Sequence, residues 1–85
     1  MKEIKIFAAK VHDFIIDFYD EKGFLPGVYL GVGSLCNINM ANTAEFRIQD
    51  HRISDEDLLQ LLKTNFPEGE FWLQFENNIF FKKGK

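Results

Sequence analysis

One cysteine and two histidines are the residues of this chain best suited to chemistry. Cys36 is the only cysteine, and His12 and His51 are the only histidines, in 85 residues. A thiol beside an imidazole forms a nucleophile and base pair, and Asp50 next to His51 supplies a carboxylate that orients an imidazole. A small enzyme that uses His51 or Cys36 is therefore one interpretation of the sequence.

The surroundings of these residues also give each of them a structural explanation. Cys36 alternates with Ile38 and Met40, which is typical of a small buried side chain on a strand. His51 lies in a polar stretch ahead of a predicted helix, and His12 lies beside the apolar stripe of another. No spacing between these residues requires catalysis, so we expect a protein that is not an enzyme.

Motifs for a metal ion or a nucleotide are weak. The run Asp55–Asp57 lacks the alternating oxygen ligands and central glycine of a calcium loop, and one cysteine with two distant histidines does not make a zinc site. The stretch 31–36 has two glycines of a dinucleotide fingerprint, but it lacks the third and opens no predicted helix. We therefore expect no metal ion and no cofactor.

Aromatic side chains next to basic ones would suit a single-stranded nucleic acid. Trp72, Phe80 and Phe81 are of the type on which bases stack. The basic residues that would accompany them are Arg47, Arg52, Lys82 and Lys83. The formal net charge is −3, with 13 acidic against 10 basic residues, whereas a nucleic-acid site usually carries a basic face. A single-stranded nucleic-acid-binding module stays an alternative, and nucleic acid is not the partner that we favour.

Ten phenylalanines, two tyrosines and one tryptophan dominate the apolar residues. Each such side chain buries about 150–250 Å² when it is enclosed, so the chain has apolar area for a core and for part of an interface. The lone cysteine forms no internal disulfide, and charged residues interrupt every apolar stretch before it reaches about 18 residues. We expect a cytoplasmic protein with neither a signal peptide nor a membrane span.

Two amphipathic helices are predicted. From Lys2 to Lys22 apolar residues recur at spacings of three and four, and Gly23 ends the segment. The alternative for its first turn is a strand over residues 4–6. Ser54 precedes three acidic residues and a leucine-rich stretch, which is typical of a helix N-cap, and Pro67 ends that second helix.

Alternation of apolar and polar residues predicts five short strands. They cover residues 28–32, 36–40, 45–49, 71–76 and 79–83. Gly33-Ser34 and Asn77-Asn78 suit two-residue hairpin turns. We therefore expect one α+β domain over residues 1–85, in the order α-β-β-β-α-β-β, with a mainly antiparallel sheet packed on the amphipathic N-terminal helix and a short basic tail at 82–85.

A two-residue turn at Asn77-Asn78 would set the register of the last two strands, with Phe75 opposite Phe80 and Trp72 opposite Lys83. One face of the hairpin would then carry Phe71, Leu73, Phe75 and Phe80, and the other would carry Trp72, Ile79 and Phe81. Soluble antiparallel sheets usually have one polar face, and here neither face is polar.

Apolar side chains on both faces indicate either a helix on each face or a partner. We favour a partner, because aromatic residues are the usual anchors of protein interfaces. The predicted partner-binding residues are Trp72, Ile79, Phe81 and Ile16, the last of which falls outside the apolar stripe of the first helix. The expected function is a non-catalytic protein that binds a protein partner, as a homodimer or as a regulatory subunit or inhibitor.

Overall fold

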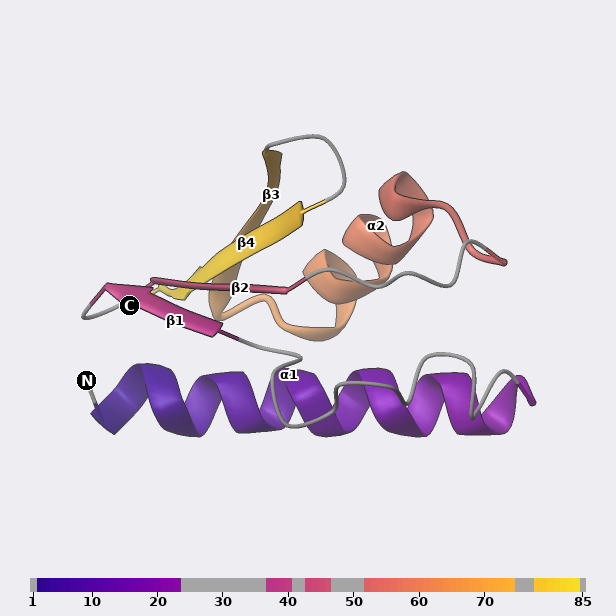
Figure 1. Cartoon of the computed structure of the whole chain (residues 1–85), viewed down its shortest axis with the longest axis horizontal. Helices are drawn as coiled ribbons and strands as arrows, with labels where there is room; N and C mark the ends of the chain where they lie inside the picture. The colour runs from indigo at the N-terminus through magenta and orange to yellow at the C-terminus, as the bar shows by residue number, and fades with distance from the viewer. Residues whose placement is uncertain (1, 24–36, 41–42, 47–51, 75–77, 85) are drawn as a thin grey trace.

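The described residues form a four-stranded antiparallel sheet and two helices (Figure 1). The computed structural model describes residues 2–23, 37–40, 43–46, 52–74 and 78–84. Its elements are α1 (Lys2–Glu21), β1 (Asn37–Met40), β2 (Thr43–Phe46), α2 (Asp55–Asn65), β3 (Gly69–Gln74) and β4 (Asn78–Lys83). The predicted α+β class is confirmed. The predicted strand at 28–32 and the turn at Gly33-Ser34 lie outside the described residues.

α1 follows the predicted apolar stripe. Ile4, Phe7, Val11, Ile15 and Tyr19 recur at spacings of three and four, and all are buried. The alternative strand at 4–6 is wrong, because these residues belong to the helix. The helix ends just before Gly23, as predicted. Gly23 lies in the left-handed region with φ of +74°, a conformation that glycine adopts at no steric cost.

α2 begins where its capping signal predicts. The Ser54 side-chain oxygen accepts a hydrogen bond of 3.1 Å from the backbone N–H of Asp57, and so satisfies one donor that the first turn leaves open. Acidic residues in the first turn and Lys63 in the last match the helix dipole at both ends. Leu58 and Leu62 form its buried face. The predicted second helix is confirmed.

The strand order is β1-β2-β4-β3, and every neighbouring pair is antiparallel. β4 therefore lies between its hairpin partner β3 and the distant strand β2. Ala44 is paired with Phe81 and Phe46 with Ile79 across β2 and β4. β2 begins at Thr43, two residues before the predicted strand at 45–49. Lys82 and Lys83 of the predicted basic tail are the last residues of β4.

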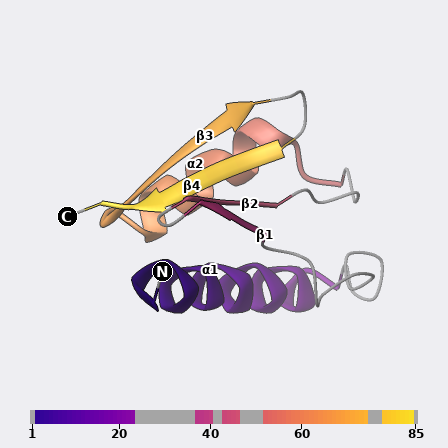
Figure 2. The same ribbon diagram turned by 60° about the vertical axis from the view of Figure 1, so that its left-hand side comes forward.

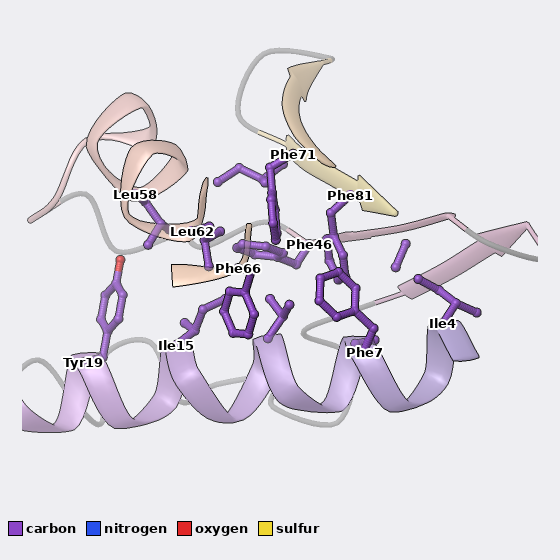
Figure 3. Close-up of a cluster of buried hydrophobic side chains, with 14 residues drawn as sticks. Ile4, Phe7, Ile15, Tyr19, Phe46, Leu58, Leu62, Phe66, Phe71 and Phe81 are labelled. Atoms are coloured by element: carbon purple, nitrogen blue, oxygen red, sulfur yellow. The ribbon is translucent and has the colours of Figure 1, made fainter. Parts of the chain in front are cut away.

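Both helices pack on the same face of the sheet. One continuous cluster joins side chains of α1, α2 and three strands, and the Phe7 ring of α1 points into it (Figure 3). The centroid of that ring lies 5.7 Å from Phe66, 6.1 Å from Phe71 and 5.8 Å from Phe81. Figures 1 and 2 show α1 along one side of the sheet. We call this the helix-covered face; the alternative of one helix on each face is wrong for the described elements.

The predicted register of the last hairpin is wrong by three residues. Phe71 is opposite Phe81, and Trp72 is opposite Phe80 rather than Lys83. Because side chains alternate between faces, a shift by an odd number moves one strand's whole set to the other face. Phe81 and Ile79 thus lie on the helix-covered face and Phe80 does not. Phe75, whose predicted partner was Phe80, lies outside the described residues.

Candidate interaction surface

The second face of the sheet carries side chains of mixed character, which we call the outer sheet face. Alternation along β2, β3 and β4 assigns to it every residue whose neighbours along the strand point into the core. These residues are Thr43 and Glu45 of β2, Glu70, Trp72 and Gln74 of β3, and Asn78, Phe80 and Lys82 of β4. No helix of the described part of the chain packs on this face.

An aromatic pair forms the centre of the outer sheet face. Trp72 and Phe80 are direct cross-strand partners, and their rings stack with centroids 6.0 Å apart and planes inclined by 20°. Such pairs add about 0.5–1.5 kcal/mol beyond the area that they bury. Phe80 is 9% exposed, whereas Trp72 is half-buried and is the more accessible ring of the two.

A side-chain hydrogen bond fixes how the indole lies. Trp72 Nε1 donates to Gln74 Oε1 at 2.9 Å, two residues further along the same face of β3. The indole N–H is therefore satisfied within the chain, and the ring is held both by this bond and by the Phe80 stack. A side chain held in one orientation loses little conformational entropy when a partner covers it.

Polar pairs surround the aromatic centre. Asn78 Nδ2 donates to Glu45 Oε2 at 3.0 Å, and Lys82 Nζ lies 4.0 Å from Glu70 Oε2. The charged residues of this face are thus two carboxylates and one ammonium group, which leaves it slightly acidic. A phosphate backbone binds basic surfaces, so the described part of the face does not suit a nucleic acid.

The four predicted partner-binding residues do not converge. Trp72 lies on the outer sheet face as expected, but Ile79 is 2% exposed and Phe81 is fully buried in the core. Ile16 is half-buried on α1 and packs against the core from the helix-covered side. The assignment of Ile79 and Phe81 to an accessible face is wrong, because it depended on the two-residue turn.

Sequence reasoning placed Phe80 in the core and so missed it as the partner of Trp72. The feature that would have identified Phe80 is whether the number of residues between the two paired strands is odd or even. Gln74 pairs with Asn78, an odd number of residues separates the two, and Trp72 is therefore opposite Phe80; the predicted turn of two residues would place them on different faces.

The candidates for catalysis are not brought into a site by the described residues. Cys36, Asp50 and His51 lie outside them. His12 Nδ1 lies 3.1 Å from the Oδ1 atom of its neighbour Asp13, whose side chain is 77% exposed, so this pair is on the surface of α1. No three His, Cys, Asp or Glu residues within the described ranges are grouped to hold a metal ion.

Neither of the two described helices is both long and apolar enough to cross a membrane. Similarity to other proteins adds nothing to the geometry: comparisons with family models, with curated proteins and with solved structures found no match to this chain. The outer sheet face, with its stacked Trp72 and Phe80, is the surface on which a functional argument rests.

Proposed function

We propose that this chain is a non-catalytic interaction domain that self-associates through the outer sheet face. The observation that carries the proposal is the Trp72–Phe80 stack, which lies on the sheet face opposite both described helices. Phe80 lies outside the cluster that joins the two helices to the sheet, and Trp72, its stacking partner, is only half-buried. Contact of the half-buried Trp72 ring with a second protein surface would remove apolar area from water and so stabilise an assembly.

The composition of the face supports a protein partner. Interfaces combine a few aromatic anchors at the centre with a polar rim, and here the rim is the Asn78–Glu45 and Lys82–Glu70 pairs. Charges of both signs favour a second copy of the same face over a strongly acidic or basic partner, because like charges need not meet. A regulatory or inhibitory role would use the same surface on a different protein.

Sedimentation velocity across a concentration series tests the proposal. We expect a concentration-dependent dimer, and we expect Trp72→Ala to weaken it by about 30-fold or more, since interface anchors contribute about 2 kcal/mol or more. Trp72→Phe keeps a ring on Phe80 and should lose less. The control is Ile6→Ala, which removes a 52% exposed apolar side chain from α1 and should leave the dimer unchanged.

Two results would contradict the proposal. A wild-type chain that stays monomeric up to millimolar concentration would remove self-association. A dimer as stable in Trp72→Ala as in the wild type, with far-UV circular dichroism showing that both are folded, would move the interface away from this face. Salt-dependent quenching of Trp72 fluorescence by a single-stranded oligonucleotide, without a dimer, would favour the nucleic-acid alternative instead.

A further inference from the structure

We propose that β3 pairs with β3 of a second copy, antiparallel and about a two-fold axis at Trp72, so that the described sheets of the two copies become one continuous sheet. This inference rests on the proposed self-association and places the contact at the β3 edge of the outer sheet face, beside Trp72. It starts from the strand order, in which β3 is an outer strand of the described sheet. An outer strand presents a row of backbone N–H and C=O groups that another strand can bind.

The backbone groups that face this edge follow from the hairpin ladder. The Gly84 N–H donates to the Glu68 carbonyl oxygen at 2.7 Å, which extends the β3–β4 register by one pair. In an antiparallel ladder, hydrogen-bonded and non-hydrogen-bonded pairs alternate. The even-numbered residues of β3 therefore bond to β4, and the N–H and C=O groups of Phe71 and Leu73 point to the outer edge. The hydrogen bonds of the described residues leave these groups unused.

The edge has few of the features that usually prevent strand pairing. β3 contains no proline and no lysine, and Glu70 is its only charged residue. Its register with β4 runs from Gly69 to Gln74 without a bulge, whereas β1 and β2 show an irregularity between Ile38 and Met40. A regular strand of six residues whose outer edge pairs with no other described strand is a good template for a second one.

One hydrogen bond selects the register. An axis that passes through a residue keeps like faces together, and an axis at Phe71 or at Trp72 gives the longest overlap of the strand Gly69–Gln74. An axis at Phe71 would need the Gly69 N–H to bond to the second copy, but that group already donates to the Phe66 carbonyl oxygen at 3.0 Å. An axis at Trp72 needs only the outward groups of Phe71 and Leu73, which make four hydrogen bonds across the two copies.

The side chains are complementary in that register. Trp72 faces Trp72 of the second copy in a non-hydrogen-bonded pair, the type in which side chains lie closer. Glu70 faces Gln74 of the second copy. Because Gln74 Oε1 already accepts from Trp72 Nε1, the amide N–H groups of Gln74 are oriented as donors for a carboxylate. The two-fold axis produces this contact twice.

A charge exchange at two exposed positions tests the pairing. Gln74→Glu keeps an acceptor for Trp72 Nε1 but places two carboxylates opposite each other, twice. We expect the dimer dissociation constant from sedimentation velocity to rise about 2- to 30-fold. The double variant Glu70→Gln/Gln74→Glu restores one carboxylate opposite one amide and should recover wild-type affinity. Gln60→Glu, at an exposed position of α2, adds the same charge away from β3; it is the matched control and should have no effect.

Amide hydrogen exchange followed by NMR gives an independent result. The N–H groups of Phe71 and Leu73 should become protected as concentration rises through the dissociation constant, while that of Trp72, bonded to β4, stays protected throughout. A dimer that is sensitive to Trp72→Ala, indifferent to Gln74→Glu and without added protection at Phe71 and Leu73 would overturn the pairing and leave the proposed function standing. The absence of any dimer would overturn both.

Discussion

Gly69→Ala tests the packing of the core at its tightest point. A Cβ atom at this position would lie 2.5 Å from Cζ of Phe7 and 2.8 Å from its Cε2 atom, where ordinary contact is 3.4–4 Å. The Phe7 ring would have to move by roughly 1 Å. It is only 2% exposed and it touches the rings of Phe66, Phe71 and Phe81, so little space receives it.

Overfilling a packed core in this way costs about 1–3 kcal/mol of the free energy of unfolding. For a domain of this size we expect the midpoint of thermal unfolding to fall by about 5–20 °C. Urea denaturation followed by circular dichroism at low protein concentration measures the loss without a contribution from self-association. Ile6→Ala on the exposed side of α1 is the control and should change the free energy by no more than about 0.5 kcal/mol.

A double-mutant cycle with Phe7→Leu identifies the cause. In the wild type this substitution removes three ring contacts and should destabilise the chain. In Gly69→Ala it also removes the clashing ring atoms, so its cost should be smaller by about 0.5–3 kcal/mol, the usual range of coupling between residues in contact. Strictly additive losses, or a Gly69→Ala variant as stable as the wild type, would refute the reasoning.

Two further predictions concern the hairpin register and the helix cap. Phe81 is fully buried and stacks on Phe71 with ring centroids 5.4 Å apart. In urea unfolding, Phe81→Ala should therefore lower the free energy of unfolding by about 3–5 kcal/mol, and Phe81→Leu by less than about 1.5 kcal/mol. A loss below about 1 kcal/mol for Phe81→Ala would instead match the register with Phe81 on the outer sheet face. Ser54→Ala should cost about 1 kcal/mol and Ser54→Asp almost nothing, since only the latter keeps an acceptor for the Asp57 N–H; equal losses for the two variants would contradict the capping role.

The elements that the sequence predicted well are those with local causes. α2 is specified by Ser54 and the acids that follow it, all within one turn of the helix start. α1 is specified by a stripe that repeats over about four turns, from Ile4 to Tyr19. Neither signal depends on where the rest of the chain lies, so both could be found without a structure.

Which sheet face each side chain of β3 and β4 lies on depends on contacts that are distant in the sequence, so local signals could not predict it. Apolar residues stand at odd and even positions of both strands, so the period of two gives no preferred face. The register that the structure adopts brings Phe81 within 5.8 Å of the Phe7 ring and 6.1 Å of the Phe46 ring. Phe7 and Phe46 are more than thirty positions from Phe81 in the sequence, so the sequence near the hairpin turn gives no information about these contacts. The predicted register placed Ile79 and Phe81 on the same face as Trp72, whereas the observed register places Phe80 there.

The two strands that pair with β4 differ in how far they lie from it along the chain, and so in the entropy lost when each pair forms. Gln74 and Asn78 of the hairpin are 4 positions apart, whereas Phe46 and Ile79, the nearest pair of β2 and β4, are 33 positions apart. Loop-closure entropy grows with the logarithm of this separation, which makes the far pair more costly to close by about 2 kcal/mol. The hairpin is therefore the cheaper unit to form, and β2 adds to a strand whose other edge is already occupied.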